Sequence, residues 1–119
     1  NKELALNKTS HFDTEALILL EEIMGDDFSE LIQVFVVDSD PKVSALHCAL
    51  EENNSLELRE IAHSFKGASS NLSALPLADL CFKIEENALH TNLEGMQPLI
   101  AAIETEYQVV KSILLSLIK

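Results

Sequence analysis

Glycine is scarce in this chain of 119 residues, which contains only Gly25, Gly67 and Gly95, all far apart in the sequence. A loop that binds the phosphates of ATP needs closely spaced glycines, because its backbone must approach the phosphate oxygens. The chain has no such loop, and we therefore expect neither an ATP site nor autokinase activity.

Basic residues are also few: 8 lysines and arginines stand against 20 aspartates and glutamates, which gives a net charge of −12 at pH 7. Nucleic acids and anionic membranes repel a chain of this charge. No apolar run reaches the roughly 18 residues that a membrane span requires, and no signal-peptide pattern occurs at the start. We expect partners that are neither nucleic acid nor membrane.

Cysteine occurs only as Cys48 and Cys81, without CxxC spacing. Both lie in ordinary helical contexts, which predicts buried free thiols in a reducing, cytoplasmic setting. No pair of histidines, cysteines or carboxylates recurs at the spacing of metal ligands, so we expect no metal site.

Apolar residues make up 47% of the chain, which excludes disorder and suffices for the core of a single domain over residues 1–119. They recur at helical spacing, and no alternating strand pattern is present. The sequence predicts an all-α fold: an antiparallel four-helix bundle over about residues 27–118, with an additional N-terminal helix over about residues 13–24.

Capping residues and prolines predict the ends of the first helices. Asp13 is an expected N-cap, and Gly25 an expected stop. The next helix covers about residues 27–52, and Pro41 should kink or briefly break it.

The later helices have similar signals. Ser55 is the expected cap of the third helix, and Pro76 opens a fourth that runs to about Leu89. Gly95 and Pro98 bracket the start of the last helix.

His63 has unusual neighbours. On a helix of about 3.6 residues per turn it shares a face with Lys66, Gly67 and Ser70. The apolar stripe of this helix lies roughly 175° away and contains Leu58, Ile61, Phe65, Ala68 and Leu72. The imidazole is therefore predicted to point into water while its helix packs inward.

An exposed imidazole on a rigid helix suits a residue that takes a group from one protein and passes it to another. Histidine side chains titrate at a pH of about 6.5, so the neutral, nucleophilic form is abundant at pH 7. Lys66 should disfavour a second positive charge on the ring and stabilise phosphoryl oxygens after transfer. Gly67 leaves room for a partner's loop.

Arg59, the sole arginine, lies one turn before His63 on the same exposed face. Between residues 55 and 75, Arg59 and Lys66 cancel the charges of Glu57 and Glu60, so the acidic excess lies elsewhere. A locally neutral to basic patch on an acidic body favours a partner with an acidic active site.

The segment Ala62–Ala74 resembles the signature of the histidine-containing phosphotransfer (HPt) family, which is roughly Ala-His-x-hydrophobic-Lys-Gly-small-small-x-x-hydrophobic-Gly-Ala. The matching residues are Ala62, His63, Phe65, Lys66, Gly67, Ala68, Ser69, Leu72 and Ala74. Phe35 and Asp38 before it, and residues 80–85 after it, extend the resemblance to about residues 27–90. Ser73 replaces the second glycine of the signature.

The resemblance implies a helical bundle that takes a phosphoryl group from a receiver-domain aspartate of a hybrid sensor kinase. His63 would hold the group and pass it to the receiver domain of a response regulator. Lys66 and Gly67 would lie near the phosphorylated ring, and Glu85 would orient it. Such a domain binds no cofactor itself, since the receiver supplies Mg²⁺. We expect it to act as a monomer, with Arg59 and Ser70 as further binding residues.

Two other hypotheses stay open. The chain could be a binding-only module that docks receiver domains without phosphorylation, or a structural bundle of a larger signalling protein. Acid-labile phosphate on the chain after incubation with a phosphorylated receiver would distinguish phosphotransfer from binding alone.

Overall fold

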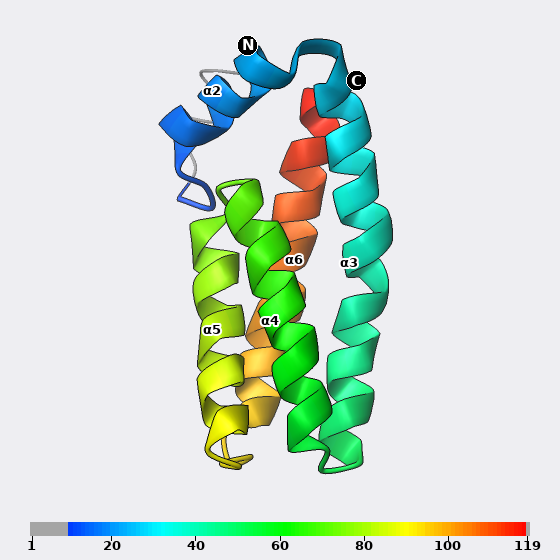
Figure 1. The fold of residues 1–119 in the computed structure, drawn as a ribbon, viewed down its shortest axis with the longest axis vertical. Coiled ribbons are helices and arrows are strands. Elements are labelled where there is room, and N and C mark those ends of the chain that lie inside the picture. The colour runs from blue at the N-terminus through cyan, green and yellow to red at the C-terminus, as the bar shows by residue number, and fades with distance from the viewer. Residues whose placement is uncertain (1–9, 119) are drawn as a thin grey trace.

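The computed structural model describes residues 10–118, and in this range it contains helices and turns but no strand (Figure 1). Residues 1–9 and 119 of the predicted domain lie outside the described range. The elements are α2 (Thr14–Met24), a 3-10 turn η1 (Gly25–Asp27), α3 (Phe28–Glu51), α4 (Ser55–Asn71), α5 (Leu75–Leu89) and α6 (Met96–Leu117). The predicted all-α fold is confirmed.

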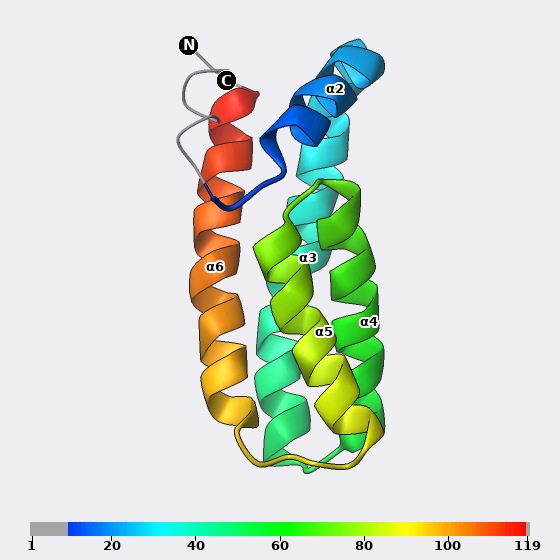
Figure 2. The ribbon, with the colours of Figure 1, turned by 90° about the vertical axis from the view of Figure 1, so that its left-hand side faces the viewer.

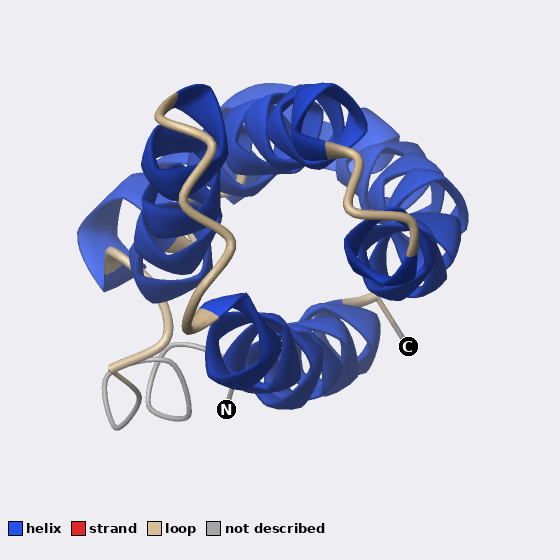
Figure 3. Ribbon diagram, turned by 90° about the horizontal axis from the view of Figure 1, so that it is seen from below, coloured by secondary structure: helices blue, strands red, loops and turns tan. Residues whose placement is uncertain are grey.

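Helices α3 to α6 form the antiparallel bundle, since short connections join them at alternating ends (Figures 1 and 2). Viewed along the bundle, the helices surround one common interior (Figure 3). Helix α2 lies across the end where α3 begins and α6 finishes. It is the predicted additional N-terminal helix.

Tyr107 of α6 lies at the centre of the core and is fully buried. Its ring centroid is 6.0 Å from that of Phe35 on α3 and 5.7 Å from that of Phe65 on α4. The hydroxyl donates to Oδ1 of Asp40 at 2.5 Å, and Nζ of Lys111 lies 3.1 Å from both carboxylate oxygens. This bond from Tyr107 holds the pKa of Asp40 below its usual value, against the effect of partial burial and with help from Lys111. Tyr107 thereby joins three helices.

Helix α3 runs unbroken through Pro41, so the expected brief break is wrong. A proline inside a helix leaves the carbonyl four residues earlier without its N–H partner. That carbonyl belongs to Val37, whose side chain is 75% exposed. Water can reach the outer face of the helix there, so the missing bond does not have to end it.

Two helix starts are as predicted and one is not. The Asp13 side chain accepts from the backbone N–H of Ala16 at 3.3 Å and caps α2, as expected. Helix α4 is capped by Asn54 and not by Ser55, because the Asn54 side chain accepts from the N–H of Glu57 at 3.0 Å. Pro76 lies in the first turn of α5, where its missing N–H has no helical partner to lose.

Both cysteines are free, but the expectation that both are buried is wrong for Cys48, which is exposed on α3. Burial raises the pKa of the Cys81 thiol on α5 to about 12. Within residues 10–118, no helix is long and apolar enough to cross a membrane.

Ser73, which replaces the family glycine, lies in the turn between α4 and α5 with φ of +61°. This left-handed conformation favours glycine, since a Cβ crowds the following carbonyl. The carbonyl of Ser73 accepts from the N–H of Asp13 at 2.8 Å, so the same turn holds the segment that leads into α2. This turn therefore favours glycine, the residue that the signature has at this position.

We predict that Ser73→Gly raises the free energy of unfolding by about 1 kcal/mol, because it removes the strain of a side chain at positive φ. Urea denaturation measures the change. Ser112→Gly is the matched control: Ser112 is exposed in the middle of α6, where the same replacement should lower stability by roughly 0.5 kcal/mol. A loss of stability in both variants would contradict this account of the turn.

Candidate functional site

His63 lies in the middle of α4 on its outward face, and its side chain is 69% exposed. Leu58, Ala62 and Phe65 on the other side of the helix are completely buried. The predicted exposure of the imidazole is confirmed. The buried face fixes the backbone of α4, so the ring stands on a rigid base.

Glu85 of the neighbouring helix α5 bridges the two charged residues of the signature. Its Oε2 lies 2.7 Å from Nδ1 of His63, and its Oε1 lies 2.7 Å from Nζ of Lys66. The Glu85 side chain is only 15% exposed, so the hydrogen bond to His63 and the ion pair with Lys66 form in a partly desolvated place. The structure thus brings the predicted residues His63, Lys66 and Glu85 into one cluster.

The bond from Glu85 determines which ring nitrogen is free. An ionised carboxylate can only accept hydrogen bonds, so Nδ1 of His63 must carry the proton that joins them. In the neutral ring the other nitrogen, Nε2, then has a lone pair and no proton. The exposed side of the imidazole is therefore a nucleophile.

Glu85 is held in its ionised form. Burial alone would raise its pKa, but hydrogen bonds from Lys66 and His63, together with their charges, lower the pKa below the usual value. Lys66 also lies over the ring of Phe82, with Nζ 5.3 Å from the ring centroid. Lys66 thus acts on the imidazole through Glu85, and its direct contact with a phosphoryl group stays a prediction.

Arg59 and His63 line the same pocket, together with Leu56, Glu60 and Glu85. Arg59 is exposed, and its guanidinium makes no hydrogen bond or ion pair within the described residues. The structure thus places Arg59 beside His63, on the exposed face where the sequence predicts it.

Gly67 and Ser70 are both exposed on the outer face of α4. A Cβ added at Gly67 would meet no neighbouring atom within 4 Å, so no other helix requires a glycine here. Ser70 lies about two turns beyond His63, and its side chain takes no part in the hydrogen bond and ion pair that join the cluster.

Apolar side chains that the sequence patterns did not single out are exposed on α4 and on the two helices beside it. Leu56, Phe82 and Leu89 are 63%, 45% and 47% exposed on α4 and α5, and Val34 and Val37 are 56% and 75% exposed on α3. Val34 lines a groove together with Ala68 and Asn71 of α4, and Ala68 directly follows Gly67 in the sequence. These residues could have been found in the sequence as apolar residues that lie outside the apolar stripe of their helix.

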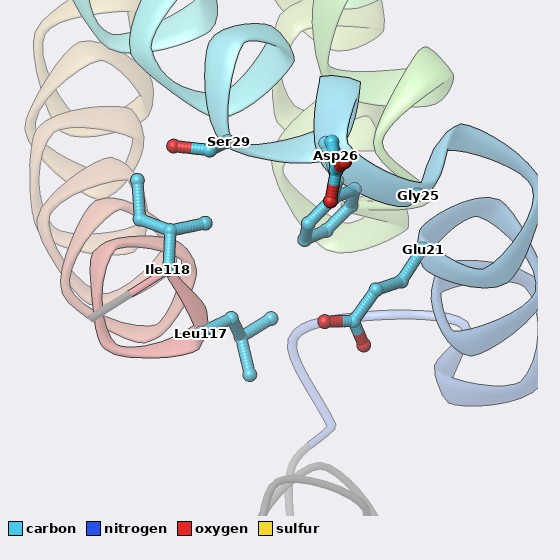
Figure 4. A pocket seen from close by; sticks show the side chains of 7 residues that line it. Glu21, Gly25, Asp26, Ser29, Leu117 and Ile118 are labelled. Carbon is cyan, nitrogen blue, oxygen red and sulfur yellow. The ribbon is translucent and has the colours of Figure 1, made fainter.

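A separate pocket lies at the end of the bundle, between α2, η1, the start of α3 and the end of α6 (Figure 4). The labelled residues around it are Glu21, Gly25, Asp26, Ser29, Leu117 and Ile118. None belongs to α4 or α5, so this pocket is not part of the His63 site. Among residues 10–118, no group of three or more histidines, cysteines or carboxylates could hold a metal ion.

A helical bundle with an exposed histidine in the middle of a helix, bonded through Nδ1 to a carboxylate of the next helix, has the architecture of a histidine phosphotransfer module. The family model of the Hpt domain matches residues 30–113, which is most of the chain. The chain belongs to this family.

Two curated relatives are histidine-containing phosphotransfer proteins of Arabidopsis thaliana. Protein 5 is 24% identical over 97 residues and protein 2 is 26% identical over 102 residues, covering 79% and 83% of this chain. The alignments cover 62% and 65% of the relatives, so the chain spans less than two thirds of their length.

Two solved structures are similar over nearly the whole chain. Histidine-containing phosphotransfer protein B (HptB) from Pseudomonas aeruginosa PAO1 is 37% identical with a TM-score of 0.87, over 92% of this chain and 95% of that chain. The maize histidine-containing phosphotransfer protein ZmHP2 also gives a TM-score of 0.87, over 99% and 98% of the chains. At 19% identity it shows the shared fold.

We predict that neutral His63 carries its proton on Nδ1, because the Glu85 carboxylate can only accept from it. Ring ¹⁵N chemical shifts at a pH of about 8, above the usual titration of histidine, report the tautomer. Glu85→Ala should increase the share of the Nε2–H form.

His90 is the internal control. It is 72% exposed at the end of α5, and its Nε2, rather than its Nδ1, lies 4.0 Å from the carboxylate of Glu86. Glu85→Ala should therefore leave the ring shifts of His90 unchanged. A wild-type His63 that is mainly protonated on Nε2 would refute the assigned roles of the two nitrogens.

Proposed function

We propose that this protein is a phosphorelay intermediate. In this proposal Nε2 of His63 accepts a phosphoryl group from the aspartate of one receiver domain and passes it to the aspartate of another. The observation that supports it is the bond between Nδ1 and Glu85, which leaves an unprotonated Nε2 on the exposed side of the ring.

The transfer step needs no proton to leave the nucleophile. The lone pair of Nε2 forms the P–N bond, while the P–O bond to the aspartate breaks and its electron pair returns to the aspartate carboxylate. The ring then carries a positive charge and still has its Nδ1 proton, which points at the Glu85 carboxylate. Glu85 therefore stabilises the phosphorylated ring, and the same step in reverse delivers the group to a second receiver.

Phosphoryl transfer depends mainly on the position of the reactants and on compensation of charge. The rigid face of α4 supplies the position, and Lys66 holds Glu85 in place and ionised. In this proposal the receiver supplies the aspartate and the Mg²⁺ ion, while this chain contributes the imidazole and its neighbours.

The surface around His63 suits a receiver domain with an acidic active site. Helix α4 carries no net charge, since Arg59 and Lys66 balance Glu57 and Glu60, whereas the chain as a whole has a charge of −12. The exposed apolar residues on either side, such as Val37 and Phe82, can be buried by a partner. Gly67 leaves space between them for a partner's loop.

We predict that His63→Gln abolishes labelling by a phosphorylated receiver, because it removes the nucleophile. The readout is acid-labile, base-stable phosphate on the chain, with circular dichroism to confirm that the helices persist. His90→Gln removes another exposed histidine and should label normally. A wild-type protein that binds receivers without taking up phosphate would instead support the binding-only module.

We further predict opposite effects of Gly67 variants on stability and transfer. Gly67→Ala should stabilise the protein by up to about 1 kcal/mol, because the added Cβ has open space and alanine favours helix. Gly67→Gln should leave the melting temperature near that of the wild type but slow transfer from a receiver.

Ser64→Gln is the control, since Ser64 is also exposed on α4 but turned about 100° from His63. It should transfer at the wild-type rate. A Gly67→Gln protein that melts much earlier, or that transfers normally, would contradict a docking role for Gly67.

A further inference from the structure

Apart from His63 itself, Arg59 is the only basic residue among those that line the pocket at His63. It lies one helical turn before His63 on the same face of α4, where the Cβ atoms of such a pair are about 5–6 Å apart. The other charged residues of the pocket are Glu60 and Glu85. A long, flexible cation therefore accompanies the nucleophile in a pocket that otherwise contains carboxylates.

The lysines of residues 10–118 are already engaged with carboxylates. Their nitrogen–oxygen distances are 3.8 Å for Lys42–Asp38, 2.7 Å for Lys66–Glu85, 3.3 Å for Lys83–Asp79 and 3.1 Å for Lys111–Asp40. Arg59 has no such partner within the described residues. Of the two cations near the imidazole, the guanidinium is thus the one with free donors.

Lys66, the other cation near the imidazole, is not free to bind a group on the ring. Its ammonium forms an ion pair with Oε1 of Glu85 and lies over the Phe82 ring. If it turned to a phosphoryl group, the ion pair between Lys66 and Glu85 would break in a place where Glu85 is only 15% exposed.

A phosphoryl group brings up to about two negative charges into this pocket. Glu60 and Glu85 would repel it unless a cation compensates. The planar guanidinium of arginine can donate two parallel hydrogen bonds to phosphoryl oxygens, which an ammonium cannot do.

We propose that Arg59 binds the phosphoryl group on Nε2 of His63, while Lys66 acts on the ring through Glu85. This assignment rests on the proposed phosphorylation of His63. It makes Arg59 the residue that compensates the charge of the phosphorylated state.

The test uses phosphoramidate, a small donor that phosphorylates histidine without a receiver. Nε2 forms the P–N bond, the P–N bond of the reagent breaks, and ammonia leaves with a proton from solvent. Because Arg59 is the sole arginine, its side-chain Nε–H gives one arginine signal in a ¹H–¹⁵N spectrum. That signal should shift when the protein is phosphorylated and stay unchanged in His63→Gln treated in the same way.

A ³¹P titration gives the second reading. Arg59→Gln should raise the pH midpoint of the phosphoryl group by roughly 0.2–0.7 unit, the size expected for an exposed ion pair. Arg59→Lys should keep part of the difference. Lys83→Gln is the matched control, since it removes the same charge at a residue outside the pocket, and it should leave the midpoint unchanged.

An unchanged Arg59 signal, or a midpoint that moves in Lys66→Gln but not in Arg59→Gln, would overturn the assignment. The absence of any His63-dependent ³¹P signal would overturn both this proposal and the proposed function. Neither reading uses a receiver. Failure of every receiver to exchange phosphate with the labelled protein would therefore reject the relay function alone.

Discussion

The site depends on the carboxylate of Glu85, which joins α5 to α4 and bonds to both the imidazole of His63 and the ammonium of Lys66. One oxygen accepts the proton of His63 Nδ1, and the other faces the ammonium of Lys66, both at 2.7 Å. Without it, the ring could exchange its proton between both nitrogens and Lys66 would have no counter-ion. A pair of bonds in a partly buried place is stronger than the same pair in open water.

The position of Glu85 depends in turn on the packing behind α4. Phe65, on the face opposite His63, packs edge-to-face with Tyr107, and Tyr107 is bonded to Asp40 of α3. Helix α4 is therefore fixed by α3 and α6 from inside, and by the tight turn at Ser73 to α5. Such packing leaves movement at the site to side chains, since displacement of the helix would disturb the whole core.

Local sequence patterns were enough for the helices and for the exposure of His63, because a helical stripe of apolar residues defines both the buried and the outward face. The sequence also indicated the surroundings of the ring through the family signature. The 2.7 Å bridge through Glu85 could not be derived, since it depends on how α5 is aligned against α4. The same limit explains the exposed Cys48 and Val37, whose surroundings depend on which neighbours cover each helix.

Departures at helix ends and at Pro41 have a different origin, which is competition between neighbouring groups. Asn54 and Ser55 are both suitable caps, and only the backbone conformation decides that Asn54 accepts from Glu57. Pro41 removes one helical hydrogen bond, but an exposed face lets water replace it. Sequence rules name the candidates in such cases, and backbone conformation at the cap or solvent access at the proline decides the outcome.

The uneven distribution of charge has a kinetic consequence. Helix α4 is electrically balanced while the chain carries −12, so the molecule has a dipole with its less negative side around His63. In the field of an acidic surface this dipole turns α4 toward that surface before contact is made. The field of such charges decays over about 8 Å at physiological ionic strength, so it acts only in the last stage of approach. Added salt screens this orienting effect, and it equally screens the repulsion between the acidic surface and the chain's net charge of −12.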